Sequence, residues 1–435
     1  MSQPIPRRAF LRGSASLAAA VTTTAFSTVR GQTAPAAPAT RGASERIVCG
    51  VVGLRRGLDL ARAIAGIEGA ELAYLCEADD NRLRDAMKAL EPTAARPKAV
   101  KDFRDLLDDK HLDAIFIATP DHWHAPAAIL ACDAGKHVYV EKPCSHNPAE
   151  GEMLIAAARK HARKVQHGTQ RRSWPGIVEG IGRVRSGEIG EVRYAKAWYA
   201  NQRGPIKPAQ ATPVPSNLDW SLWQGPAPER SYQDNVHPYN WHWLWHWGTG
   251  EMGNNGVHAI DLCRWGLGVD YPLRVTAGGG RFAFDDEQET PDTQIGAFDF
   301  GVKFISVEIK STQPRGFEGS NSGAAFYGTK GTLVCGDSTY KMFDLKNEAV
   351  GANEQSGRGD AGHVDNFLRA IRGDAALAAE IEEGHKSTLL CHLANIAWRT
   401  GSTVNLDPQT HRIIGNKDAD TLWSREYRKG WEPKV

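Results

Sequence analysis

One lysine of this sequence stands where a reacting group is expected. Lys142 lies between Glu141 and Pro143, directly after the apolar run 137–140, which is predicted to be a strand. Open parallel sheets bind their ligands in a crevice at the carboxyl ends of the strands. A lysine whose pKa is lowered by burial can accept a proton or polarise a developing ketone oxygen. Lys142 is therefore our first candidate for a residue that touches both a cofactor and a substrate.

A histidine in the stretch 250–261 is the second candidate. This stretch reads G-E-M-G-N-N-G-V-H-A-I-D and leads into an apolar helix. With α-helical spacing, Asn254, His258 and Asp261 share one face, which would set the imidazole between an amide and a carboxylate. Histidine titrates near neutral pH and suits the transfer of a hydroxyl proton. We predict a catalytic group of Lys142, His258, Asn254 and Asp261, with a merely structural core histidine as the alternative.

The turn after the predicted strand 47–52 suits the phosphates of a dinucleotide. A strand, a glycine-containing turn and a helix place the exposed N–H groups of the helix under a pyrophosphate. The turn reads Gly53, Leu54, Arg55, Arg56 and Gly57. The fingerprint G-x-G-x-x-G would need glycines at 55 and 58, where Arg55 and Leu58 stand. The fingerprint is incomplete, and an ordinary structural turn stays the alternative.

An acidic residue strengthens the prediction of a nucleotide site. Glu77 ends the second predicted strand, 24 positions after Gly53. An acid near this offset accepts hydrogen bonds from both ribose hydroxyls and repels a 2′-phosphate. NAD is therefore the favoured cofactor. NADP stays open, because Arg55 or Arg56 could supply a countercharge to the pyrophosphate or to a 2′-phosphate.

The first part of the chain must form the sheet that positions these groups. Apolar strands are predicted at 47–52, 71–76, 112–118, 137–140 and 165, alternating with helices at 58–67, 81–90, 102–107, 125–134 and 148–160. This alternation predicts a doubly wound parallel sheet. The fold class is α/β, with a Rossmann-type NAD-binding domain over residues 46–170.

The pattern changes after residue 171. Strands are predicted at 191–199, 273–277, 292–300, 305–311, 323–327 and 331–335, and helices at 176–185, 364–371 and 386–400. Alternating apolar residues predict a large, mostly antiparallel sheet with one solvated face. We assign residues 171–405 to an α+β substrate and oligomerisation domain and residues 406–435 to a C-terminal tail.

Aromatic residues gather in the second domain. Six of the 13 tryptophans lie between residues 220 and 247, and the last four of them are two residues apart: Trp220, Trp223, Trp241, Trp243, Trp245 and Trp247. Aromatic faces commonly pack against sugar C–H groups, but spacing by two is also typical of a strand with one buried face. The candidates for substrate contact are Lys142, Arg171, Tyr239, Trp241 and His258.

Composition narrows the class of partner. The 435 residues include 52 basic and 51 acidic side chains, a net charge of +1. This balance argues against nucleic acid or an anionic membrane as a partner and favours a small, neutral substrate. His122 and His124 do not stand in a spacing typical of zinc ligands, so we expect no metal.

The N-terminal segment is predicted to direct export. Arg7 and Arg8 open a twin-arginine signature, residues 13–29 form a weakly apolar region, and small residues and prolines follow. We assign residues 1–45 to a signal peptide and linker and expect a periplasmic protein, exported folded, with no membrane contact in its mature form. A disordered or membrane-anchoring N-terminus is the alternative. The seven cysteines are odd in number and lack a C-x-x-C pair, which favours buried free thiols.

Four motifs together resemble the Gfo/Idh/MocA oxidoreductase family, which includes glucose-fructose oxidoreductase and inositol dehydrogenases. They read T-P-D-H-W-H from residue 119, E-K-P from 141, G-T-Q-R-R-S from 168 and G-N-N-G-V-H-A-I-D from 253. The resemblance covers nearly the whole chain after the signal and is closest to the twin-arginine-exported branch.

The resemblance implies roles for particular residues. Lys142 would be the catalytic lysine and His258 the acid/base histidine. The nicotinamide end of the cofactor would be lined by Thr119, Pro120, His122, His124, Glu141 and Gln170. The second sheet would supply the substrate floor and the interface of a homo-oligomer, a dimer or tetramer. Many family members have aspartate where this chain has Asn254, so the proton relay would differ here, with Asp261 orienting the imidazole.

These observations predict an NAD(P)-dependent oxidoreductase that acts on a secondary hydroxyl of a sugar or polyol with tightly bound cofactor. One alternative is a hydrolase or lyase that uses NAD to form a transient keto-sugar. Another is a sugar-binding protein that has lost catalysis.

Overall fold

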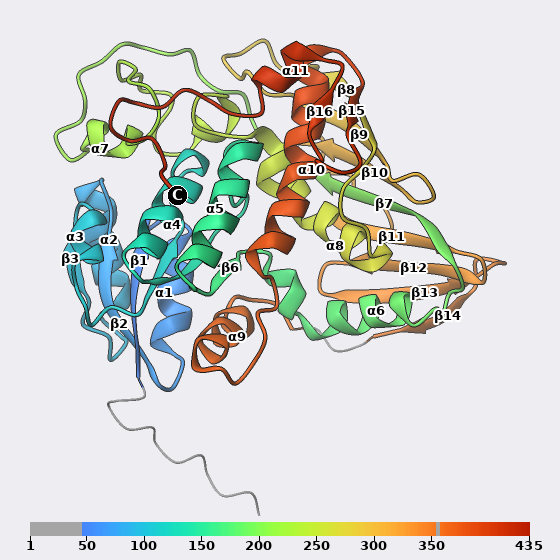
Figure 1. Ribbon diagram of the computed structural model, residues 1–435, viewed down its shortest axis with the longest axis horizontal. Helices are drawn as coiled ribbons and strands as arrows, with labels where there is room; N and C mark the ends of the chain where they lie inside the picture. Colours follow the sequence, from blue (N-terminus) through green and yellow to red (C-terminus); the bar gives the residue numbers. More distant parts are fainter. Residues whose placement is uncertain (1–45, 354–356) are drawn as a thin grey trace, which may run out of the picture. The chain divides into compact units, whose positions relative to one another are not determined.

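The computed structural model describes residues 46–353 and 357–435 (Figure 1). The predicted signal peptide and linker, residues 1–45, lie outside the described residues. The first sheet has six strands in the order β3-β2-β1-β4-β5-β6, and all its pairs are parallel. The strands are β1 (Ile47–Val52), β2 (Ala70–Cys76), β3 (Lys98–Val100), β4 (Ala114–Ile117), β5 (His137–Val140) and β6 (Val165–His167). This is the strand order of dinucleotide-binding sheets and confirms the Rossmann-type fold.

Helices on both faces bury this sheet, which explains why β4 is apolar and buried along its whole length. They are α1 (Gly57–Ala65), α2 (Asp80–Leu90), α3 (Arg104–Leu107), α4 (Asp121–Asp133) and α5 (Pro148–Lys160). A late helix, α9 (Ala361–Arg372), also packs here against α1, with Val364, Phe367 and Leu368 in the same core (Figure 1). The core of the first domain therefore depends on a segment far along the chain.

The second sheet has ten strands in the order β14-β13-β12-β11-β7-β10-β9-β8-β15-β16. The strands predicted from sequence are β7 (Val192–Ala200), β8 (Arg274–Gly280), β9 (Thr293–Asp299), β10 (Phe304–Lys310), β11 (Ser322–Gly328) and β12 (Gly331–Gly336). Neighbouring strands run antiparallel except β7 and β10, which confirms a mostly antiparallel sheet. Four short strands were not predicted: β13 (Thr339–Asp344), β14 (Ala349–Ala352), β15 (Val404–Leu406) and β16 (Ile413–Ile414).

One face of this sheet is covered by helices. They are α6 (Pro175–Arg185), α8 (Val257–Leu267) and α10 (Ile381–Thr400). Residues such as Phe298, Ile305 and Val307 alternate along β9 and β10 toward this core, while their neighbours face the other side. The helix α10 also contacts α5, so it belongs to the packing of both domains.

The aromatic-rich segment between β7 and α8 is not a strand. It contains the short helix α7 (Trp220–Gln224) and a 3-10 turn at Asn240–Trp243. Trp220, Trp223 and Trp247 pack against one another as a core, with ring centroids 4.7 to 5.8 Å apart. The two-residue spacing of these tryptophans is therefore not that of a β-strand, because the segment forms short helical turns.

Residues 406–435 are held against the rest of the chain. After α11 (Lys417–Thr421), the Arg425 side chain donates to the Glu150 carboxylate, and the Trp431 ring meets Trp123 of α4 edge-on at 5.3 Å. All seven cysteines lie in the described part and are buried free thiols. Within residues 46–353 and 357–435, no helix has the length and apolar character needed to cross a membrane.

A buried ion pair fixes α8 to the domain boundary. Arg172 donates to both carboxylate oxygens of Asp261, at 2.9 and 2.8 Å, and the Ser387 hydroxyl of α10 donates to the same carboxylate at 2.7 Å. Burial alone would raise the pKa of Asp261, but the Arg172 guanidinium holds it below the ordinary 3.8. A lowered carboxyl pKa stabilises the fold above pH 3.8, and this stabilisation is lost as the pH falls further.

Asp261→Asn should therefore destabilise the protein strongly. The change removes the carboxylate that Arg172 bonds at both oxygens and leaves the partly exposed Glu383, 3.6 Å away, as its remaining ion pair in the described chain. We expect a cost of up to about 3 to 5 kcal/mol. Urea unfolding at pH 7 measures the loss. Asp133→Asn is the control, because its side chain is 70% exposed and His161 is its one ion-pair partner among the described residues. Such surface pairs contribute about 1 kcal/mol or less. Equal unfolding midpoints for the two variants would contradict a structural role for Asp261.

Candidate active site

A cavity of about 610 Å³ lies at the carboxyl ends of β1, β2, β4 and β5. The first domain contributes to its wall Gly53, Leu54, Arg55, Arg56, Glu77, Thr119, Pro120, Asp121, His124, Glu141 and Lys142. The second domain contributes Tyr199, Asn201, Arg203, Trp223, Tyr239, Trp241, His242, Asn254 and Asn255. This is the crevice predicted from the order of the strands, and side chains of both domains converge in it.

The turn between β1 and α1 uses its two glycines for close packing. Gly53 has a φ of +84°, and a Cβ there would lie 2.5 Å from the Ala118 carbonyl oxygen at the end of β4. A Cβ on Gly57 would lie 2.8 Å from a Val51 methyl group. These are the tight-turn and helix-packing functions of the first and third fingerprint glycines. The turn fits a dinucleotide although its spacing is irregular and Arg55 replaces the middle glycine.

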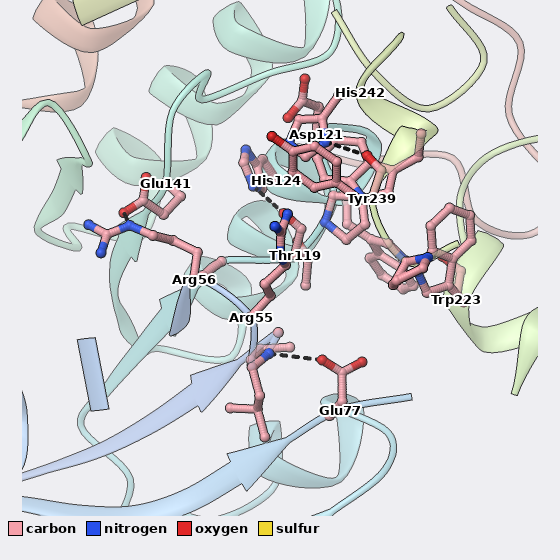
Figure 2. A pocket seen from close by; sticks show the side chains of 18 of the residues that line it. Arg55, Arg56, Glu77, Thr119, Asp121, His124, Glu141, Trp223, Tyr239 and His242 are labelled. Atoms are coloured by element: carbon pink, nitrogen blue, oxygen red, sulfur yellow. Dashed lines mark hydrogen bonds and ion pairs between the residues drawn. The ribbon is translucent and has the colours of Figure 1, made fainter. Parts of the chain in front are cut away.

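Glu77 faces this turn from the end of β2 (Figure 2). Its carboxylate accepts a hydrogen bond from the Leu54 N–H at 2.8 Å, and burial raises its pKa. The nearby cations Arg82 and Lys101 are paired with Asp79 at 3.8 Å and Asp80 at 2.9 Å. The end of the cavity that suits an adenosine ribose is thus acidic, as NAD requires.

The two arginines of the turn differ in their surroundings. Arg56 donates to Asp360 at 2.6 and 2.7 Å and pairs with Glu141 at 3.0 Å. Arg56 is therefore neutralised by two carboxylates and is not the free countercharge considered from sequence. The Arg55 guanidinium instead lies over the Tyr239 ring, 3.9 Å from its centroid.

Some residues of the motif from Thr119 to His124 line the cavity, and others are buried in the core. Thr119, Pro120 and His124 line the cavity as predicted, and the His124 ring nitrogens face the Thr119 and Pro143 carbonyl oxygens at 2.8 and 2.6 Å. His122, also predicted to line the nicotinamide end of the cofactor, does not line this cavity. Its side chain is fully buried, and its Nε2 atom lies 3.1 Å from the Trp223 carbonyl oxygen.

Lys142 extends from the end of β5 to the second domain. Its Nζ atom donates to the backbone oxygen of Asn254 at 2.7 Å and to the Asn254 side-chain oxygen at 2.9 Å. Burial lowers the pKa of Lys142, although the Glu141 and Asp121 carboxylates oppose this shift. Both hydrogen-bond acceptors are neutral oxygens. When Lys142 loses its proton, no directly bonded carboxylate is therefore left without its countercharge.

Asn254 reaches Lys142 because the chain forms a π-helical turn at Met252–Gly256, directly before α8. Such turns are rare and frequently mark functional sites. The turn is also tied to a buried carboxylate, Glu251, which accepts from both Asn254 and Asn255. Arg203 pairs with Glu251 at 2.6 Å and donates to the Tyr239 hydroxyl at 2.5 Å. A continuous polar network thus leads from Lys142 to Tyr239.

His258 lies beneath the wall rather than on it. Its side chain is 8% exposed, and its Nδ1 atom has no hydrogen-bond partner among the described residues. Burial lowers its pKa well below the ordinary value, and the positive charges of Arg171 and Lys142 add to this effect. Both effects favour the neutral form of the imidazole.

Three further predicted site residues lie away from the cavity wall. We expected Asp261 to orient His258, but its carboxylate is bonded to Arg172 and Ser387 instead. Arg171 donates to the Ser322 hydroxyl at 2.9 Å, and burial lowers its pKa to about 10. Gln170 lies in the same 3-10 helix, and its side-chain oxygen is buried without a partner among the described residues.

Several wall residues were not identified from sequence. Asp121 accepts from the Thr249 hydroxyl at 2.6 Å, and its place in the T-P-D-H motif was the only signal for it. Glu251 does not line the cavity but bonds to Asn254 and Asn255 of the wall, and it stands in the same glycine-rich stretch. Arg203 and Asn201 follow β7 in a loop without periodicity, so nothing in the sequence pointed to them. Within the described chain, no three His, Cys, Asp or Glu side chains converge as metal ligands would.

Both domains match models of one oxidoreductase family. Residues 47–169 match the model described as oxidoreductase family, NAD-binding Rossmann fold, and residues 192–433 match the C-terminal alpha/beta domain of that family. Among solved structures, levoglucosan dehydrogenase in complex with NADH and levoglucosan has a TM-score of 0.65 and 18% identity, covering 84% of this chain and 100% of that one. At this identity the likeness shows the fold alone.

Named relatives are similar over part of their length. An inositol 2-dehydrogenase of Salmonella typhimurium is 33% identical over 145 residues, which are 33% of this chain and 42% of that protein. A glycosyl hydrolase family 109 protein of Saccharopolyspora erythraea is 26% identical over 231 residues, 46% of this chain and 50% of that protein. This chain thus spans half or less of these relatives. The two family models, which together cover most of the chain, establish that it belongs to the Gfo/Idh/MocA oxidoreductase family and contains an NAD-binding domain.

Proposed function

We propose that this oxidoreductase acts on a secondary hydroxyl of a sugar or polyol and keeps its NAD bound between turnovers. The observation that carries the proposal is the position of Lys142. This amine lies at the carboxyl end of β5, inside the cavity of an NAD-binding domain, and it is held by Asn254 of the second domain. When bound, NAD supplies the acceptor for the hydride that leaves the carbinol carbon.

The wall offers a place for each part of the cofactor. Glu77 would accept the adenosine ribose hydroxyls, and the turn Gly53–Arg56 would hold the phosphates. Thr119, Pro120 and His124 would face the nicotinamide end next to Lys142. Thr119 has a buried hydroxyl oxygen without a partner in the described structure, which leaves a polar atom available to a ligand.

Lys142 is suited to take the hydroxyl proton. Burial lowers its pKa, so more of the neutral amine is present near neutral pH than for an exposed lysine. His258 lies beneath the wall rather than on it, so we propose Lys142 as the group that meets the hydroxyl. Tyr239, Trp241 and His242 supply aromatic surface and polar atoms typical of a sugar site, and the stacked Trp241 and His242 rings lie 3.6 Å apart.

A segment of the second domain supports retention of the cofactor. We call residues 205–242 the cover segment, because Trp223, Tyr239 and His242 from it form part of the cavity wall (Figure 2). It is attached to the end of β2: Asp219 N–H donates to the Ala78 oxygen at 3.0 Å, Asp80 N–H to the Asn217 oxygen at 2.8 Å, and the Asn217 amide to Asp79 at 2.7 Å. Release of a bound dinucleotide would then require these contacts to open.

A second candidate function is an NAD-assisted glycoside hydrolase, and the similarity to the family 109 protein favours it. With the same Lys142, it would oxidise the sugar transiently to a ketone, with the hydride passing to NAD, and the acidified adjacent C–H bond would allow elimination of the glycosidic substituent. Addition of water and return of the hydride would then give an unoxidised sugar and restore the oxidised cofactor. The two functions differ in product. Incubation with a panel of sugars, polyols and glycosides followed by mass spectrometry separates them. A keto-sugar supports the dehydrogenase, whereas an unoxidised released sugar supports the hydrolase.

A binding protein without catalysis is the third function to be tested. Lys142→Ala would leave ligand affinity unchanged in such a protein, and the wild-type chain would convert no sugar. Conversion by the wild-type chain that is lost in Lys142→Ala contradicts this function.

We also propose export through the twin-arginine signature at Arg7 and Arg8, and assembly into a homo-oligomer. The outer face of the second sheet exposes Tyr194, Ile295, Phe304 and Tyr327, apolar side chains that a second copy would cover. Cell fractionation of a variant with both arginines changed to lysine tests export, and sedimentation tests assembly. If the variant with both arginines changed to lysine still reaches the periplasm, the proposal of twin-arginine export is contradicted. If the wild-type chain sediments as a monomer, the proposal of a homo-oligomer is contradicted.

The pH dependence of oxidation should report Lys142. We expect kcat/KM to rise with pH through an inflection below 10.5, the ordinary lysine pKa, because burial favours the neutral amine. Asn254→Asp places a negative charge against Nζ and should move the inflection to higher pH. Asn416→Asp makes the same change at the start of α11, where either residue caps a helix, and should leave the profile unchanged. An unmoved inflection in Asn254→Asp would rule out Lys142 as the titrating base.

Loosening the cover segment should speed the loss of nucleotide. Asn217→Ala removes one hydrogen bond to Asp79, worth about 1 kcal/mol, and should raise the dissociation rate of bound NAD about fivefold. Gln210→Ala, an exposed change in the same segment, is the matched control. The measurement is the amount of nucleotide retained during timed dialysis. Equal retention by both variants would mean that the segment does not hold the cofactor.

A further inference from the structure

Arg55 occupies a position that the phosphate turn usually keeps empty. The dinucleotide fingerprint has its second glycine here so that the backbone can approach the pyrophosphate. In this chain the position carries the longest cationic side chain instead, and that side chain is part of the cavity wall. Figure 2 shows it extending from the turn toward Tyr239 of the cover segment.

Among the described cations of the wall, Arg55 and Lys142 are the two without an acidic partner, and Arg55 also lacks a hydrogen bond. Arg56 is paired with Glu141 and Asp360, Arg203 with Glu251, Arg82 with Asp79 and Lys101 with Asp80. Lys142 donates to Asn254. Within residues 46–353 and 357–435, Arg55 has neither an ion pair nor a hydrogen bond, and its one recorded contact is the face of the Tyr239 ring. All five guanidinium donors therefore remain available to a ligand.

The Arg55 guanidinium is accessible to an anion and lies beside aromatic side chains. Its neighbours are aromatic: Tyr239 lies below the guanidinium, and the charge of Arg55 contributes to the lowered pKa of His242, which burial mainly causes. Arg55 is itself exposed in this structure, so an anion can reach its guanidinium. A planar guanidinium binds two phosphate oxygens at once.

We propose that the Arg55 side chain binds the pyrophosphate of the dinucleotide and replaces the backbone contact that the second glycine provides in related turns. This inference rests on NAD binding by the first domain. The contact with Tyr239 then links the phosphates to the cover segment, so the residue that binds the anion also joins the two walls of the cavity.

Binding of ADP-ribose and adenosine to the full-length chain tests this role without measuring turnover. Copurified nucleotide is first removed with charcoal, and affinities are measured by calorimetry at low and high salt. Arg55→Ala and Arg55→Gly should weaken ADP-ribose at least tenfold, reduce its salt dependence and leave adenosine within twofold. The glycine variant is informative because it restores the missing fingerprint glycine. Arg62→Ala, an exposed change of equal charge on α1, should bind both ligands as the wild type does.

Other results would overturn the proposal. If Arg55→Gly binds ADP-ribose as tightly as the wild type, the backbone suffices and the side chain has no such role. If both ligands weaken equally, Arg55 supports the site in general rather than the pyrophosphate. If ADP-ribose is unaffected but glucuronate binds more weakly, the anion belongs to a substrate. Failure of the wild-type chain to bind either nucleotide would contradict NAD binding itself, which separates that failure from a failure of the Arg55 assignment.

Discussion

The candidate site depends on one amine that is held in a partly buried cavity by neutral oxygens. Burial disfavours an ammonium ion, so Lys142 must either be compensated or lose its proton readily. The two Asn254 oxygens that accept from Nζ satisfy its hydrogen bonds without fixing its charge. The contact also joins the two domains, because Lys142 ends a strand of the first sheet and Asn254 lies in the π-helical turn before α8. Proton transfer and domain contact thus share one pair of residues.

The remaining charges are arranged around this pair. Arg56, Arg203 and Arg172 are each bonded to a buried or partly buried carboxylate, which removes the cost of an isolated internal charge. Among the described wall residues, Lys142 and Arg55 are the cations without a carboxylate bonded to them. One suits proton transfer and the other an anion. The cations that are paired with a carboxylate thus stabilise the structure, whereas the two without one are available for proton transfer and for binding an anion.

The sequence predicted much of the fold and less of the site. Apolar strands alternating with helices identified the parallel sheet, and E-K-P placed Lys142 at its edge, because both signals are local. The ion pair between Arg56 and Asp360 joins residues 304 positions apart. Asp261 pairs with Arg172 because the tertiary packing brings these two side chains together. No local pattern encodes either. The π-helical turn also broke the α-helical spacing between Asn254 and His258, from which we had placed these two residues on one helix face.

The most direct test of this account follows the bound nicotinamide itself. Purified wild-type protein that retains NAD is mixed with an excess of its sugar, and the near-ultraviolet absorbance of reduced nicotinamide is recorded during one turnover. We predict a rapid rise in the wild type and none in Lys142→Met, with equal amounts of nucleotide bound to both. Reduction at the wild-type rate in Lys142→Met would contradict the central role of this amine.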